Sequence, residues 1–212
     1  PDLEVDFPAS FVWLSSEGVP VTLIGRDYIH EEVAGRRYRL SAGSFFQANT
    51  EQAEHLIRLV AEGLAPTGGE TLLDMYCGVG TFGLALADRV RAVIGVEENP
   101  WAIQDARANA EGCSNVTFLE GRVEDVVPHL DRAVQLAVLD PPRTGVDPRA
   151  LQALSKLAPQ RIAYVSCDPA SLARDLKILA AAGYAVRNIW PVDMFPQTYH
   201  IECVAKLERR EG

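Results

Sequence analysis

Two side chains in the second half of the sequence could together perform covalent chemistry. Cys167 directly precedes a predicted helix that opens at Pro169, and Glu202 lies in an apolar strand-like run. Free backbone amides at a helix N-terminus favour a thiolate, so we expect the thiol pKa of Cys167 to fall below about 8.5. Partial burial should raise the carboxyl pKa of Glu202 toward the range of a general base. The alternatives are a small buried cysteine and an ordinary strand residue.

A double proline stiffens the turn that carries a third candidate group. The turn runs Asp140-Pro141-Pro142-Arg143 and follows a strand-like run, at the sheet edge where ligands of parallel α/β folds bind. A carboxylate and an arginine held there could orient a planar polar ring, with Arg143 donating two hydrogen bonds to a carbonyl or a phosphate. A surface ion pair on a rigid turn is the structural alternative.

A glycine-rich turn indicates a nucleotide-type site. A strand-like run that ends at Tyr76 leads into Gly78, Gly80 and Gly83, and a helical pattern begins at Thr81. Glycines let the backbone approach a ligand closely, and free amides at the start of the helix can bind it. Gly78 and Thr81 are therefore candidate cofactor contacts, and the alternative is a tight structural turn.

Two acidic residues near this turn help to separate two classes of cofactor. Glu97 ends the second strand, 19 positions after Gly78, where it could accept hydrogen bonds from both ribose hydroxyls of a dinucleotide or of S-adenosylmethionine. The glycines also satisfy the dinucleotide fingerprint, so a nicotinamide-dependent oxidoreductase is an alternative. Asp74, inside the first strand, could meet the amino group of a methionine moiety but would repel a pyrophosphate. We therefore favour S-adenosylmethionine.

The elements that must position these groups alternate from Thr71 onward between β-rich runs and helical periodicity, which predicts a mostly parallel sheet with helices on both faces. The loop over residues 191–199 has no helical pattern, so the last two strands should pair antiparallel. The predicted fold class is α/β, a Rossmann-like seven-stranded sheet of the methyltransferase type with an antiparallel last strand. Strands are predicted near residues 71–76, 91–96, 116–119, 135–140, 161–166, 185–190 and 200–206, and helices over residues 81–88, 100–111, 148–157 and 169–182.

The first part of the chain has a different pattern. Strand-like runs over residues 11–14, 19–24 and 37–40 predict a small N-terminal antiparallel β subdomain, and an amphipathic helix follows over residues 50–65. Glycine and proline then break the pattern up to Gly69. We predict a β-rich subdomain over residues 1–49, a linking helix and boundary loop over 50–69, and a methyltransferase domain over 70–212.

Composition limits the class of protein. With 212 residues, 48% of them hydrophobic, the chain can bury a substantial core, and it has neither a bilayer-spanning apolar stretch nor a signal-peptide pattern. We expect a cytoplasmic protein without a membrane partner. The four cysteines are widely spaced with no Cys-x-x-Cys pair, so we expect no metal site. A net charge of −9 requires any contact with nucleic acid to come from clustered cations, such as Arg36, Arg37 and Arg39, or from a further domain.

Five motifs, taken in order, resemble the RNA 5-methyluridine methyltransferase family over roughly residues 21 to 207. They are Phe45-Phe46-Gln47-Ala48-Asn49, the turn from Asp74 to Phe82, Asp140 to Arg143, Ser166 to Pro169, and Thr198 to Glu202. The resemblance implies S-adenosylmethionine as cofactor, contacted by Gln47, Tyr76, Glu97 and Asp140. It also implies Cys167 as nucleophile, Glu202 as proton acceptor, and transfer RNA or ribosomal RNA as the substrate.

The sequence departs from the family's usual features in several ways, and two alternative activities must be compared with the resemblance. Gln197 and Tyr199 stand where many relatives have histidine, and the sequence shows neither the N-terminal oligonucleotide-binding barrel nor the iron–sulfur cysteines found in such relatives. We therefore expect a longer protein whose other part could bind RNA. A cytosine-5 enzyme would have a cysteine where Arg143 follows the prolines, and an oxidoreductase leaves Cys167 and Glu202 unexplained. No pattern indicates an obligate protein partner.

Overall fold

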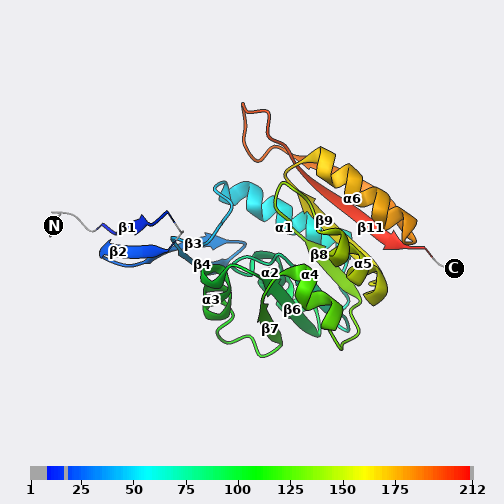
Figure 1. Ribbon diagram of the computed structural model, residues 1–212, viewed down its shortest axis with the longest axis horizontal. Helices are drawn as coiled ribbons and strands as arrows, with labels where there is room; N and C mark the ends of the chain where they lie inside the picture. Colours follow the sequence, from blue (N-terminus) through cyan, green and yellow to red (C-terminus); the bar gives the residue numbers. More distant parts are fainter. Residues whose placement is uncertain (1–8, 17–18, 211–212) are drawn as a thin grey trace.

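A seven-stranded sheet forms the centre of the protein (Figure 1). The computed structural model describes residues 9–16 and 19–210. The order across the sheet is β10-β11-β9-β8-β5-β6-β7. The strands are β5 (Thr71–Met75), β6 (Ala92–Glu97), β7 (Val116–Glu120), β8 (Leu136–Leu139), β9 (Arg161–Ser166), β10 (Tyr184–Val192) and β11 (Glu202–Arg209).

The centre of the sheet is parallel and one end is antiparallel. The five strands that follow one another across the sheet as β9, β8, β5, β6 and β7 pair in parallel. Strand β11 pairs antiparallel with both β9 and β10. Strands β5 and β8 are buried along their whole length, as expected of continuous apolar strands covered by helices on both faces. The predicted Rossmann-like sheet and the antiparallel pairing of its last strands are confirmed.

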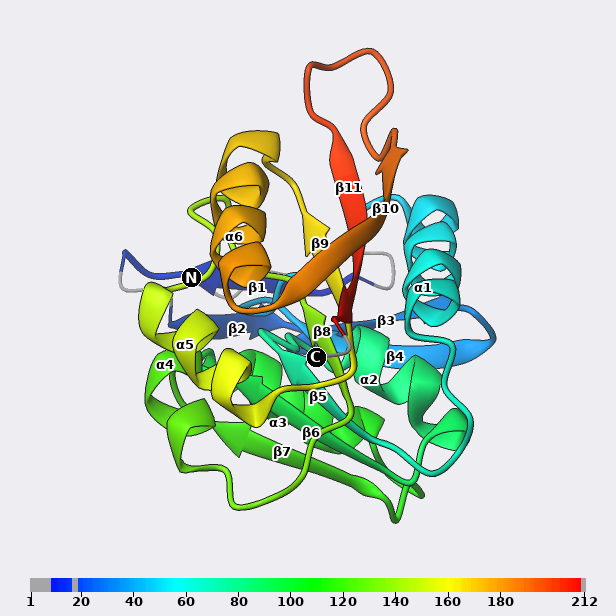
Figure 2. The ribbon, with the colours of Figure 1, turned by 90° about the vertical axis from the view of Figure 1, so that its right-hand side faces the viewer.

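Helices cover both faces of the sheet. One core layer contains α1 (Thr50–Leu64), α2 (Thr81–Leu86) and α3 (Pro100–Asn109), and the other contains α4 (Val123–Val126), α5 (Pro148–Leu157) and α6 (Pro169–Ala181). Figure 2 shows α1 and α6 on opposite sides of the strands. The 3-10 turns η1 (Ala87–Arg89) and η2 (Val127–His129) continue α2 and α4. Helices α3, α5 and α6 open with proline after a capping Asn99, Asp147 or Asp168, so the side chain replaces missing backbone partners.

The N-terminal part is antiparallel, as predicted, and forms two hairpins, each a two-stranded sheet. Strands β1 (Phe11–Leu14) and β2 (Pro20–Ile24) form one, and β3 (Tyr28–Val33) and β4 (Arg36–Ser41) form the other. The sequence analysis missed β3 because its polar run of His30, Glu31 and Glu32 hides the strand pattern. A two-residue turn with positive φ at Ala34 and Gly35 connects β3 to β4, which is the geometry that suits the twist of a hairpin. The first eight residues of the predicted 1–49 segment lie outside the described residues.

The second hairpin packs onto the main core. Val33, Tyr38 and Leu40 are buried in the same core layer as α1 to α3. Ser41 donates its backbone N–H to Asp105 Oδ2 at 2.6 Å and its hydroxyl to Asp105 Oδ1 at 2.8 Å, which ties the end of β4 to α3. Among the helices that the structure describes, none has the length and hydropathy needed to cross a membrane.

Candidate active site

A cavity of about 530 Å³ opens at the carboxyl end of the parallel strands. This volume lies in the range of small-molecule sites, and the position is the one at which open α/β sheets bind ligands. Every predicted site residue except Asp74 lines it. These residues are Gln47, Tyr76, Gly78, Thr81, Glu97, Asp140, Arg143, Cys167 and Glu202.

Backbone amides hold the Glu97 carboxylate at the end of β6. Gly78 donates its N–H to Glu97 Oε2 at 3.0 Å, and Asn99 donates its N–H to Oε1 at 2.8 Å. A carboxylate oxygen has two lone-pair sites, so each oxygen can still accept a hydrogen bond from a ligand. Glu97 is therefore fixed in place while it keeps the capacity to bind a pair of hydroxyl groups.

The glycine turn is shaped by close contacts at its later positions. Gly80 has a φ of +89°, and a Cβ atom there would lie 2.9 Å from side-chain carbons of both Leu84 and Phe118. A Cβ atom on Gly83 would lie 2.8 Å from Asp74 Oδ2. Glycine is therefore required for the backbone conformation at one position and for the approach of α2 to β5 at the other.

Asp74 lies behind the turn and does not reach the wall of the cavity. Its side chain is fully buried, Oδ2 accepts the backbone N–H of Gly83 at 2.8 Å, and Oδ1 has no hydrogen-bond partner within the described residues. Burial raises the pKa of Asp74 to about 7, the Gly83 N–H opposes that shift, and Glu97 adds to it. The contact expected between this carboxylate and a cofactor amino group stays a prediction, with Oδ1 as the oxygen that would make it.

The pairing of β9 with β11 brings the two candidate catalytic groups to one end of the sheet. Cys203 pairs with Ser166, and the next residues beyond that pair are Glu202 and Cys167. Glu202 is buried, and burial raises its carboxyl pKa, which confirms the direction predicted from its apolar strand. The last strand, predicted over residues 200–206, begins at Glu202, so His200 precedes β11, where it stacks against Tyr199 with ring centroids 4.2 Å apart.

The predicted direction of the Cys167 pKa is wrong. The thiol pKa is raised, mainly by burial and then by the negative charges of Glu202 and Asp140. Its own backbone amide and Arg143 oppose the shift without overcoming it. Asp168 caps α6 by accepting the Ser171 N–H at 2.7 Å, so a carboxylate occupies the helix end that was expected to stabilise a thiolate. Burial and the neighbouring carboxylates therefore outweigh the helix N-terminus in setting the direction of the thiol pKa.

Acidic residues surround the cavity. The pKa of Asp140 is raised well above its ordinary value by burial, and then by the charges of Glu202, Asp74 and Glu97. Mutual repulsion of this kind favours a ligand that carries positive charge. Arg143 is exposed at the rim and forms no ion pair with any described residue, so the surface ion pair considered above is not formed.

Several other residues line the cavity, although the sequence alone predicted no role for them. Phe45 is exposed at the cavity while Phe46 packs against Tyr38, with ring centroids 5.7 Å apart. Asn99 caps α3 and also donates its side-chain N–H to the Gly43 carbonyl at 2.8 Å, which holds the segment before α1 against the start of α3. The Asn-Pro pair at the start of α3 was the available signal, although it indicates only a helix start.

A protein-family model matches almost the whole chain. It is described as tRNA (Uracil-5-)-methyltransferase, and it matches residues 16–133 and 121–210. The chain belongs to this family. The resemblance inferred from the five motifs is therefore confirmed.

Relatives agree with the family. An uncharacterized RNA methyltransferase of Gloeobacter violaceus is 49% identical over 189 residues, which cover 88% of this chain and 41% of the relative. One of Streptomyces coelicolor is 44% identical over 98% of this chain and 46% of its own length. The chain therefore spans less than half the length of these family members.

Solved structures support the same family and fold. The tRNA (uracil-54, C5)-methyltransferase of Pyrococcus abyssi, solved in complex with S-adenosyl-L-homocysteine, superposes with a TM-score of 0.78 at 39% identity, over 90% of this chain and 46% of that one. Trm5b of the same organism superposes with a TM-score of 0.66 at 15% identity, over 94% of this chain and 62% of that one. The second likeness shows the fold alone.

Proposed function

We propose that the protein transfers a methyl group from S-adenosylmethionine to carbon 5 of a uridine in RNA, through a covalent bond between Cys167 and carbon 6 of the base. The observation that carries this proposal is the shared cavity, in which Cys167, Glu202 and Arg143 face the glycine turn and Glu97. Membership of the tRNA (uracil-5-)-methyltransferase family supports uracil as the base, and Arg143 stands where a cytosine-5 enzyme would have a cysteine.

The acidic character of the cavity fits S-adenosylmethionine. This cofactor carries an ammonium and a sulfonium group, whereas a dinucleotide carries a pyrophosphate that the same carboxylates would repel. When bound, it supplies an electrophilic methyl group. Glu97 would accept the ribose hydroxyls, and Asp74 would contribute negative charge from behind the turn. The other residues proposed to hold the cofactor are Gln47, Tyr76, Gly78, Thr81 and Asp140.

Cys167 supplies what carbon 5 of uracil lacks. This carbon is a weak nucleophile until a group adds at carbon 6 and pushes the double-bond electrons toward carbon 5 and the carbonyl at carbon 4. The Cys167 thiol gives its proton to solvent water, its sulfur forms a bond to carbon 6, and the double bond between carbons 5 and 6 opens to give an enolate.

Glu202 and Arg143 act on the ring after and during that addition. Once carbon 5 is methylated, the Glu202 carboxylate takes the remaining proton from carbon 5, the carbon–carbon double bond reforms, and the thiolate of Cys167 leaves. Arg143, exposed at the rim and free of an acidic partner among the described residues, can donate hydrogen bonds to the enolate oxygen.

The proposed function goes with a division of the chain into three parts. We assign residues 70–212 to the methyltransferase domain, residues 50–69 to a linking helix and boundary loop, and residues 1–49 to a small β-rich unit. The RNA is a transfer RNA or a ribosomal RNA, and the target uridine must leave its stack to reach Cys167. An unpaired position is therefore preferred to a helix interior.

The test measures methyl transfer from labelled S-adenosylmethionine to unmodified transfer RNA and ribosomal RNA, followed by digestion and mass spectrometry of the nucleosides. We expect 5-methyluridine in one of the two RNA classes. Formation of 5-methylcytidine would show that the substrate base is cytosine and would contradict the proposal of uridine. Binding of a nicotinamide dinucleotide in place of S-adenosylmethionine, measured by calorimetric titration, would contradict the proposal.

A further inference from the structure

The loop that follows β8 carries Asp140 and Arg143 to the cavity and then runs to the start of α5. It has no regular secondary structure, and its prolines fix only its first part. Its second part, residues 144–147, lies against α6, the helix that begins directly after Cys167 and Asp168. Two consecutive residues of that helix, Arg174 and Asp175, form the polar contacts between the helix and the loop.

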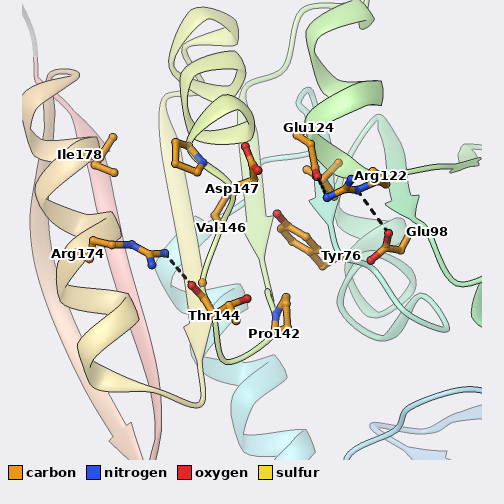
Figure 3. A pocket seen from close by; sticks show the side chains of 13 residues that line it. Tyr76, Glu98, Arg122, Glu124, Pro142, Thr144, Val146, Asp147, Arg174 and Ile178 are labelled. Atoms are coloured by element: carbon orange, nitrogen blue, oxygen red, sulfur yellow. Dashed lines mark hydrogen bonds and ion pairs between the residues drawn. The ribbon is translucent and has the colours of Figure 1, made fainter.

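Asp175 is a fully buried carboxylate that binds the loop backbone. Its Oδ2 atom accepts the Val146 N–H at 2.8 Å and the Tyr164 hydroxyl at 2.6 Å. Its Oδ1 atom accepts the Arg174 Nε–H at 2.8 Å and lies 2.8 Å from Arg174 Nη2. Arg174 Nη2 also donates to the Thr144 carbonyl at 2.9 Å, as Figure 3 shows beside Val146 and Pro142. The helix therefore binds the loop at two backbone positions, one on either side of Gly145.

The helix and the loop approach each other most closely at Gly145. Its φ of +78° lies in the left-handed region, and a Cβ atom there would lie 2.6 Å from Asp175 Oδ2 and would overlap the Arg174 guanidinium. No other residue type fits this position without moving the pair. The contact is consequently a close-packed one with little freedom to shift.

The same helix thus bears on two catalytic elements. Its N-terminus is joined to Cys167 through Asp168, whose carboxylate caps the helix. About two turns later, Arg174 and Asp175 hold the loop that presents Arg143. The thiol and the guanidinium come from different strands, β9 and β8, so their relative placement depends on a contact between the elements that follow those strands.

We propose that Asp175, assisted by Arg174, is a positioning residue that sets the Arg143 loop relative to Cys167. It touches neither cofactor nor substrate and acts through Arg143. The ion pair itself contributes little net stability because the Arg174 side chain is half exposed, whereas a buried carboxylate with four donors fixes the geometry of the groups that it binds. This inference rests on the proposed function, because Arg143 needs a reaction in which to act.

The test is a double-mutant cycle on RNA methylation with the full chain. Asp175→Asn keeps the size of the side chain and one acceptor oxygen but removes the charge that holds Arg174. We expect its turnover at saturating RNA to fall roughly 10- to 100-fold, which is the effect of displacing a catalytic group by about 1 Å. Affinity for S-adenosylmethionine, measured by calorimetry, should change by less than about twofold, since the glycine turn and Glu97 lie on other elements and Asp140 precedes the two prolines that fix the first part of the loop.

The second half of the cycle separates positioning from general damage. In an Arg143→Ala background, Asp175→Asn should reduce turnover by less than about twofold, because the group that it positions is gone. Asp105→Asn is the matched control: Asp105 is another fully buried helix carboxylate, bound by Ser41 and Ser44 on the opposite face, and its effect should multiply with that of Arg143→Ala.

The outcomes decide the inference. Losses from Asp175→Asn and Arg143→Ala that multiply, or a loss of cofactor affinity as large as the loss of turnover, would overturn it. If Asp175→Asn does not fold, Arg174→Lys keeps a cation beside Asp175 but cannot bind both Asp175 and Thr144, and it must show the same dependence on Arg143. If the unmodified protein methylates no RNA, the proposed function fails, and that result is distinct from a cycle that is simply multiplicative.

Discussion

The two sides of the cavity hold their carboxylates in opposite ways. On the cofactor side, Glu97 accepts backbone N–H groups from Gly78 and Asn99. On the side of the chemistry, no described residue donates a hydrogen bond to the side chain of Glu202, and burial raises its pKa. The carboxylate proposed to bind the cofactor is held in place by backbone amides, whereas the carboxylate proposed to accept a proton has no such donors and a raised pKa.

Cys167 belongs to the second side. Burial and then the two neighbouring carboxylates raise the pKa of its thiol, although a helix begins two residues later. Helix amides influence a thiol only where nothing nearer opposes them, and here Asp168 already caps the helix. This contrast between amide-bonded and unbonded acids leads to four predictions.

The largest effect is expected from Glu202→Gln. Turnover should fall roughly 10²- to 10⁴-fold, the range for loss of a general base. Because addition of Cys167 precedes proton removal, a covalent protein–RNA complex should accumulate on ordinary uridine RNA, visible on a denaturing gel. Glu208→Gln, on the same strand but ion-paired with Arg187 and Lys206, is the control and should keep wild-type turnover. Near-normal turnover of Glu202→Gln would remove Glu202 from the mechanism.

On the cofactor side, Glu97→Gln should weaken binding and leave chemistry nearly intact. Hydrogen bonds to a charged group contribute about 1.5–3 kcal/mol, so the Kd for S-adenosylmethionine should rise roughly 10- to 100-fold. Turnover at saturating cofactor should stay close to that of the unmodified protein. Glu120→Gln is the control, since Glu120 pairs with Glu97 in the sheet but does not line the cavity. An equal loss in turnover would erase the distinction between the two sides.

The pH dependence of Cys167 should respond to its acidic neighbour. A negative charge beside a thiol disfavours the thiolate, so neutralising Glu202 as Gln lowers the pKa of Cys167. The rate of alkylation by iodoacetamide, followed at the Cys167 peptide by mass spectrometry, should therefore rise at lower pH in Glu202→Gln than in the unmodified protein. A curve that stays in place, or that moves to higher pH, would show that Glu202 does not act on the thiol.

The smallest effect is expected from Cys113→Ser. Cys113 lies on the far side of α3, half-buried against Arg36, and does not line the cavity. The free energy of unfolding should change by about 1 kcal/mol or less, and turnover should be unchanged. Thermal melting and a methylation assay check the two expectations. A strong loss of activity would mean that a second cysteine takes part in the reaction.

The cofactor side could be predicted from local sequence because its groups are neighbours along the chain. The glycine turn follows one strand, and Glu97 ends the next, so strand order alone brings them together. The hairpin formed by β3 and β4 was harder to predict, because its polar residues hide the alternation and its packing onto α3 depends on contacts between distant segments.

The other side shows what local patterns cannot supply. The motif around Cys167 identified the residue, but the direction of its pKa depends on Glu202, which a strand pairing across 35 positions brings close. The spacing of Asp74 from the glycines did not indicate that Gly83 would bind one of its carboxylate oxygens, Oδ2, or that its side chain would lie behind the residues that line the cavity. The role of Asp175 depends on a contact between a loop and a helix that share no motif.

The most direct test of the covalent mechanism uses RNA that contains 5-fluorouridine, incubated with the protein and S-adenosylmethionine. Fluorine at carbon 5 cannot leave as a proton, so the adduct should persist on a denaturing gel, with mass spectrometry placing the base on Cys167. Cys167→Ala should give no adduct. Methylation of ordinary uridine RNA by a protein that forms no adduct with fluorinated RNA, or an adduct at another residue, would contradict the account.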